Sequence, residues 1–171
     1  MDSRRHQFPN DWPAPESYLT ELGRMTVLWG SLEALTVAAI SKLAGYEQNL
    51  DARALVLTAH MNFQQRIDVI SALCEQLAED HPRLANHEPV IKLLKAAQKQ
   101  RNKFAHNGLG YDSENPEVTL TYATARGSLK LHSEIVRLAD IKEVSCKIHE
   151  ALLGLHELVT GVRYPPIWER T

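Results

Sequence analysis

The stretch ESYLTELGRMTVLWGSLEALTVAAISKLAG, residues 16–45, sets the fold class because its apolar residues recur at alternating spacings of three and four. That period places one face of an α-helix in a core. Gly45 is typical of the residue that follows a helix end. We therefore expect a long amphipathic helix of about seven turns. Its apolar face consists of Tyr18, Leu22, Met25, Trp29, Leu32, Thr36, Ala39 and Leu43.

The same period predicts further helices along the chain. A short helix is expected over residues 51–60 with Asp51 as its N-cap, and a third over residues 62–80 with Asn62 as its cap. A fourth helix should run from about residue 88 into the segment RNKFAHNG, residues 101–108, where Gly108 and Gly110 would end it. A last helix is expected over residues 141–159.

Between the last two helices the period changes to two. Val118, Leu120 and Tyr122 alternate with polar residues, and a turn sequence at 126–128 is followed by a second alternating run. We expect a β-hairpin over residues 117–136. The fold class is therefore all-α, a bundle of about five helices with a small β-hairpin insertion before the last helix. Residues 1–15 form an extended arm, 16–161 the helical domain and 162–171 a tail.

Composition restricts the classes of function. The 171 residues are 44% hydrophobic and 23% charged with a formal charge of -2, which argues against binding of nucleic acid by the whole surface. We expect a cytoplasmic protein that does not contact a membrane, with Cys74 and Cys146 as reduced thiols. There is no glycine-rich phosphate loop, no nucleophile beside a base and no catalytic carboxylate pair, so no cofactor or metal is expected. His149 and His156 lie seven residues apart, without the further ligands of a metal site.

The segment RNKFAHNG breaks the apolar pattern of its helix. Arg101 falls in the middle of the stripe that includes Leu94, Ala97 and Phe104, and a guanidinium there requires an acceptor. Asn102 and His106 are four residues apart, so the amide could orient the imidazole.

Basic residues surround the segment. Residues 91–110 contain no acidic residue, and their lysines form a stripe that could attract a polyanion such as RNA. The predicted RNA-binding residues are Lys95, Lys99 and Lys103.

RNKFAH resembles the R-x4-6-H signature of HEPN domains, in the form with a polar residue after the arginine. The long first helix with RMTVLWGSLEALT, the helix with FQQRIDVISAL and the hairpin before the last helix are also similar to prokaryotic HEPN proteins, over roughly residues 17–160. Arg53 with His60, and Arg126 with His132, fit the loose signature too, but neither arginine is followed by asparagine near a helix end.

The resemblance implies a metal-independent endoribonuclease of the toxin or phage-defence type, with an active site between two copies of the chain. Arg101 would bind the scissile phosphate, His106 would transfer a proton and Asn102 would orient one of them. Such a homodimer would be controlled by an antitoxin or another regulatory protein.

Two other interpretations stay open. Glu33, supported by Arg66, is the expected ion partner of Arg101, yet it could be an ordinary boundary residue. Arg101 could also be a clamp between helices, at a helix end where the dipole favours cations. The chain would then be a non-catalytic HEPN module that binds a protein partner or a nucleotide.

Overall fold

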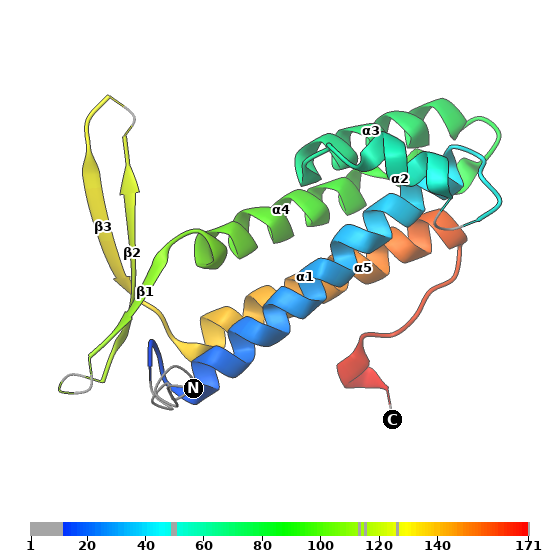
Figure 1. Cartoon of the computed structure of the whole chain (residues 1–171). Coiled ribbons are helices and arrows are strands. Elements are labelled where there is room, and N and C mark those ends of the chain that lie inside the picture. Colours follow the sequence, from blue (N-terminus) through cyan, green and yellow to red (C-terminus); the bar gives the residue numbers. More distant parts are fainter. Residues whose placement is uncertain (1–11, 49–50, 113, 115, 126, 171) are drawn as a thin grey trace, which may run out of the picture.

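The computed structural model describes residues 12–48, 51–112, 114, 116–125 and 127–170. Within them the chain is mostly helical, with one small antiparallel sheet between the fourth and fifth helices (Figure 1). The helices are α1 (Glu16–Leu43), α2 (Ala52–Thr58), α3 (Phe63–Leu77), α4 (Glu88–Ala105) and α5 (Leu138–Thr160), with 3-10 turns η2 (Pro82–Asn86) and η3 (Ile167–Glu169). The strands are β1 (Gly108–Tyr111), β2 (Val118–Thr124) and β3 (Lys130–Ile135).

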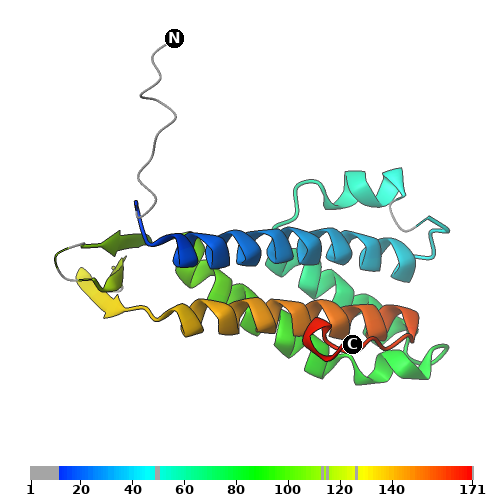
Figure 2. The ribbon, with the colours of Figure 1, turned by 90° about the horizontal axis from the view of Figure 1, so that it is seen from below.

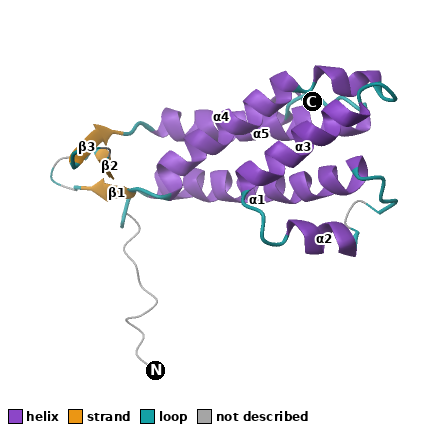
Figure 3. Cartoon of the chain, turned by 90° about the horizontal axis from the view of Figure 1, so that it is seen from above, coloured by secondary structure: helices purple, strands orange, loops and turns teal. Residues whose placement is uncertain are grey.

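The two long helices α1 and α5 form the centre of the molecule. They lie side by side, run in the same direction and both start next to the sheet, as Figure 2 shows. α4 packs along α5 in the opposite direction, and α3 packs on α1 and α4. The sheet projects from one end of the bundle, and α2 lies on the outside of α1 (Figure 3). One apolar core therefore joins α1, α3, α4, α5 and β2.

The predicted helices and their caps are confirmed at several ends. Asp51 accepts a hydrogen bond from the Arg53 amide at the start of α2. Asn62 forms a capping box with Gln65 at the start of α3. Gly161 follows α5 with a φ of 76°, the left-handed conformation that glycine adopts readily. Most of the predicted N-terminal arm, residues 1–11, lies outside the described residues.

The predicted hairpin is present as β2 and β3, which pair antiparallel, but the sheet has one more strand than expected. It has three strands in the order β1-β2-β3, and Gly108 and Gly110, expected to end the fourth helix, lie in β1 opposite Thr121 and Thr119. α4 already ends at Ala105. The added strand is possible because Leu109 and Tyr111 point to the face that packs on the core, where alternate residues of a strand belong.

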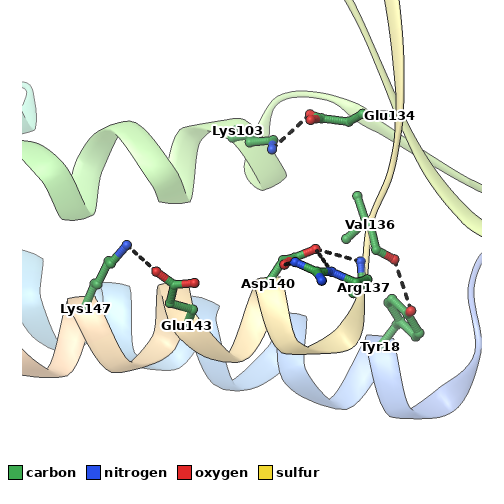
Figure 4. Close-up of polar contacts among 8 residues, drawn as sticks. All are labelled: Tyr18, Lys103, Glu134, Val136, Arg137, Asp140, Glu143 and Lys147. Atoms are coloured by element: carbon green, nitrogen blue, oxygen red, sulfur yellow. Dashed lines mark hydrogen bonds and ion pairs between the residues drawn. The ribbon is translucent and has the colours of Figure 1, made fainter.

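The last helix starts three residues earlier than expected, at Leu138. The Asp140 carboxylate accepts from the Arg137 amide at 2.9 Å and from its guanidinium at 2.9 Å (Figure 4). These hydrogen bonds from Arg137 lower the pKa of Asp140. Just before this cap, the Tyr18 hydroxyl donates to the Val136 carbonyl at 3.1 Å. The starts of α1 and α5 are therefore tied together beside the sheet.

By length and composition, α1 would also suit a membrane span, and among the described residues it is the one helix that does. A buried core helix passes the same test, and α1 buries Met25, Trp29 and Leu32 in this core. The predicted cytoplasmic location stays a prediction.

Candidate functional site

The segment RNKFAH, residues 101–106, forms the last turn of α4 and its C-cap. Arg101 and Asn102 belong to the helix, and His106 is its C-cap residue, whose amide donates to the Asn102 carbonyl at 3.2 Å. Two residues, His106 and Asn107, connect α4 to β1. The Asn107 side chain donates back to the Lys103 carbonyl at 2.7 Å and satisfies one of the free carbonyls of the helix end. The motif therefore lies where α4 connects to the sheet, and a hydrogen bond from Asn107 closes the end of the helix.

Arg101 is half-buried against the indole ring of Trp29. Its Cζ atom is 5.1 Å from the ring centroid, within the range of a cation–π contact. Trp29 is itself buried and contacts Phe63 of α3, with ring centroids 4.4 Å apart. The guanidinium is thus accommodated in the apolar stripe by an aromatic face, and the contact joins α4 to α1. This arrangement agrees with the interpretation of Arg101 as a clamp between helices.

The expected ion pair between Arg101 and Glu33 is not formed. Among the ion pairs of the described residues, neither Glu33 nor Arg66 takes part. In place of a carboxylate, the guanidinium contacts the Trp29 ring, one turn before Glu33 on α1, and the Asn102 Oδ1 atom. Arg66 is half-buried, and its Nε atom has no hydrogen-bond partner in the described part of the chain. Supporting roles for Glu33 and Arg66 stay predictions.

The Asn102 side chain bonds to Arg101 and not to the His106 imidazole. The Asn102 Oδ1 atom accepts a hydrogen bond from the Arg101 guanidinium at 3.3 Å. The His106 side chain is exposed, and no hydrogen bond joins it to Asn102. Within the described residues, a single copy therefore brings Arg101 and Asn102 together through their side chains, and the His106 side chain lies exposed at the same end of α4.

In the fold, carboxylates from other elements neutralise part of the positive charge of the lysine stripe. Lys103 forms an ion pair of 2.9 Å with Glu134 of β3 (Figure 4), and Lys95 lies 4.0 Å from Asp68 of α3. Lys99 is exposed and takes part in none of the ion pairs of the described residues. The carboxylates come from other elements, which explains why a stretch without acidic residues does not produce a purely cationic surface.

A shallow hollow of about 250 Å³ lies between the end of α4 and α5. Its lining carries charges of both signs, and none of Arg101, Asn102 and His106 belongs to it. Two of its lining residues, Glu143 and Lys147, form an ion pair along α5 (Figure 4). The hollow therefore does not provide a binding site that the motif residues share. Its lining residues are Gln100, Lys103, Phe104, Asp140, Glu143, Val144 and Lys147.

Two histidines of α5 contact aromatic residues of the C-terminal tail, and the sequence alone does not indicate these contacts. The rings of His149 and Trp168 meet edge-on with centroids 5.2 Å apart, and His156 contacts Tyr164 at 5.1 Å. The seven-residue spacing of the histidines was the available signal, because it places both on one face of α5. In the described residues no group of three or more metal-binding side chains is found.

Comparisons of the chain with family models, with curated proteins and with solved structures found no match. The structure shows a helical bundle with a small three-stranded sheet. The assignment to the HEPN family stays a proposal.

Proposed function

We propose that the chain is a metal-independent endoribonuclease of the HEPN type, active as a homodimer in which two copies of the 101–106 segment meet. The observation that carries this proposal is the position of Arg101, Asn102 and His106 in the last turn of α4, directly before a strand. The exposed imidazole and the half-buried guanidinium are both open to an approaching phosphate. Their order also resembles the R-x4-6-H signature.

The proposed reaction is an internal transesterification. His106 of one copy takes the proton of a ribose 2′-hydroxyl, and the 2′-oxygen attacks the neighbouring phosphorus. The bond from phosphorus to the 5′-oxygen breaks, and the histidine of the second copy, in its protonated form, gives a proton to that leaving oxygen. Arg101 holds the phosphate and stabilises the added negative charge of the transition state. The products are a 2′,3′-cyclic phosphate and a 5′-hydroxyl.

The arrangement in one copy supports the proposed dimer. Asn102 accepts from Arg101, and in the described part of the chain no hydrogen bond joins the His106 side chain to Asn102, so we propose that a second copy supplies the facing groups. Lys95, Lys99 and Lys103 would contact the RNA backbone, and Glu33 and Arg66 would support Arg101 from behind. Control by an antitoxin or another regulatory protein, as in toxin or phage-defence systems, belongs to the same proposal.

A second candidate is a non-catalytic module that binds a protein partner or a nucleotide. Two observations favour it: Arg101 already has an aromatic partner in Trp29, and Lys103 is paired with Glu134. Under this alternative the motif holds helices together and performs no chemistry.

Cleavage of total RNA by the purified chain in EDTA separates the two candidates. We expect cleavage by the wild type and a loss of about 100-fold or more in His106→Ala, the scale of a missing acid–base group. Arg101→Ala should be inactive too. The matched controls are His60→Ala, at an exposed histidine outside the motif, and Arg53→Ala, at the second residue of α2; both variants should cleave normally.

Equal cleavage by the wild type and both motif variants would trace the activity to a contaminant and reject the nuclease proposal. Absence of cleavage at high protein concentration would reject it as well and favour the interaction module. Analytical ultracentrifugation of the same samples tests the dimer, which should be present in the inactive variants.

A further inference from the structure

A cavity of about 650 Å³ lies between α1 and α5 on the side covered by the C-terminal tail, and the motif of α4 does not contribute to it. That volume is within the usual range of small-molecule sites in proteins. α1 contributes residues one turn apart, α5 does the same, and η3 of the tail forms one wall. The lining residues are Glu21, Arg24, Leu28, Lys142, Ser145, Cys146, His149, Ile167 and Trp168.

At the floor of the cavity, two buried polar side chains each have one atom without a hydrogen-bond partner among the described residues. Glu21 is 6% exposed and Ser145 is 5% exposed. One Glu21 oxygen pairs with Arg24, but the other, Oε2, has no hydrogen-bond partner among the described residues, and neither has the Ser145 Oγ atom. Burial of a carboxylate oxygen and a hydroxyl without partners is unfavourable. Together they offer an acceptor and a second group that can donate or accept.

One wall of the cavity is aromatic and apolar. Trp168 is 51% exposed and is held edge-on against His149, whose Nε2 atom accepts a hydrogen bond of 3.0 Å from the Ile167 amide. Leu28 contributes further apolar surface from α1. A tryptophan fixed in this way presents a flat face on which a planar ring can pack.

The rim of the cavity is cationic. Arg24 is exposed and uses part of its guanidinium for Glu21, which leaves other N–H groups free to bind an anion. Lys142 is exposed and is in none of the ion pairs of the described residues. An acidic floor and a basic rim therefore face the same space.

We propose that this cavity binds a small planar nitrogen heterocycle that carries an anionic group, a nucleoside monophosphate. An N–H group of the heterocycle donates to Glu21 Oε2, and a neighbouring ring atom pairs with Ser145. The ring packs on Trp168, and the phosphate contacts Arg24 and Lys142. This site is separate from the proposed nuclease site and does not depend on it.

Cys146 supplies a direct readout, because its exposed thiol lines the cavity while the other cysteine, Cys74, is buried. We would measure the rate at which a thiol reagent modifies Cys146 in the full chain, with each of the four ribonucleoside 5′-monophosphates. Nucleosides without phosphate and inorganic phosphate alone are run in parallel. At least one monophosphate should slow the modification at saturation and raise the melting temperature, more strongly than its nucleoside or phosphate does.

Isothermal titration of variants with the same monophosphate tests the assignment of residues. Glu21→Gln, Ser145→Ala and Trp168→Ala should each weaken binding by about tenfold or more, the loss expected for one good contact. Glu16→Gln, an exposed glutamate of α1 outside the cavity, is the matched control and should bind like the wild type.

Three results would overturn the proposal. None of the monophosphates protects Cys146 or binds at millimolar concentration; or Glu21→Gln and Ser145→Ala bind as well as the wild type; or Arg101→Ala abolishes binding, which would move the nucleotide to the motif of α4. Because RNA cleavage is not measured in any of these assays, failure here leaves the nuclease proposal intact, and the reverse also holds.

Discussion

The Arg101 guanidinium lies over the Trp29 indole, with its Cζ atom 5.1 Å from the ring centroid. This contact gives the arginine of the motif a structural role that exists without any substrate. It also positions the guanidinium from behind, since Trp29 is fixed in the core by Phe63. A structural role and a catalytic role for Arg101 therefore have to be separated by substitution.

Substitution of Arg101 should affect stability and activity differently. We expect Arg101→Ala to lower the free energy of unfolding by about 1–2 kcal/mol, from the loss of the cation–π contact and of side-chain packing. Arg101→Lys keeps a cation over the ring and should retain most of that stability, yet it lacks the forked donors that suit a phosphate. Urea denaturation and RNA cleavage are measured on both variants.

Lys99→Ala, at an exposed position of the same helix, is the control and should change stability by less than about 0.5 kcal/mol. If Arg101→Ala is as stable as the wild type, the contact with Trp29 does not contribute to stability. If Arg101→Lys cleaves RNA normally, the forked geometry is not needed for the reaction.

The ion pair between Lys103 and Glu134 should limit RNA binding. Both side chains are more than a third exposed, so the pair contributes only about 0–1 kcal/mol to stability. Glu134→Gln releases Lys103 for a phosphate and should raise the affinity for single-stranded RNA by about two- to tenfold at low salt. Binding is measured at several salt concentrations in a His106→Ala background, which prevents cleavage under our proposal.

The matched control for that experiment is Glu143→Gln, which releases Lys147 of α5 in the same way but outside the lysine stripe. An equal gain in both variants would mean that any loss of negative charge increases RNA affinity. In that case Lys103 would not contact RNA.

His149 should titrate below the ordinary range of histidine. Burial lowers the pKa of its imidazole, and the nearby Arg170 lowers it further, while Glu150 acts in the opposite direction. The unfolded chain therefore gains a proton at a higher pH than the folded chain does. Stability from the docked tail is complete above about pH 6.5, the ordinary value, and is lost as the pH falls through the lower pKa of the folded state.

NMR titration of the His149 ring protons tests this pKa shift. Trp168→Ala uncovers the ring and should move the pKa back toward the ordinary value, and thermal unfolding should then depend less on pH below about 6.5. Leu131→Ala, on an exposed strand position far along the sheet, is the control. An unshifted pKa in the wild type would contradict the buried environment of this histidine.

The two cysteines should differ strongly in reactivity. Burial raises the pKa of the Cys74 thiol to about 11, whereas Cys146 is exposed. The folded chain should react with one equivalent of a thiol reagent at pH 8, and the chain in denaturant with two. Because the folded state keeps the Cys74 proton longer than the unfolded state, stability should fall as the pH rises above the ordinary thiol value, about 8.5–9. Reaction of two thiols under native conditions would contradict this burial.

The helices were predictable because burial imposes a period on the sequence. The alternating three- and four-residue spacing from Tyr18 to Leu43 leaves no other regular structure that hides every apolar side chain. The caps at Asp51 and Asn62 could be predicted for the same local reason, since each side chain bonds an amide two or three residues ahead.

Strand β1 could not be predicted because its stability is not local. GLGY is four residues long and half glycine, which favours a loop when it is considered alone. It becomes a strand because β2, whose first residue lies ten positions after Gly108, provides hydrogen bonds and because Leu109 and Tyr111 find apolar neighbours.

The candidate site was also predictable only in part. The sequence indicates that Arg101 falls within the apolar stripe of its helix, since this depends only on positions within that helix. It does not indicate that Trp29 approaches the guanidinium, or that Glu134 and Asp68 approach the lysines, because those contacts depend on the register between separate elements. Contacts between residues of different helices and strands therefore could not be predicted from the sequence.

The connection between α4 and β1 has only two residues, which restricts the backbone position of His106. Helix and strand are each fixed by the core, and the Asn107 amide is anchored to the Lys103 carbonyl at 2.7 Å. The backbone of His106 is consequently held between the end of α4 and the start of β1, although His106 itself lies outside regular structure. An insertion of one residue before Gly108 would therefore change the position of β1 relative to α4, while His106 would stay bonded to the end of the helix through its amide.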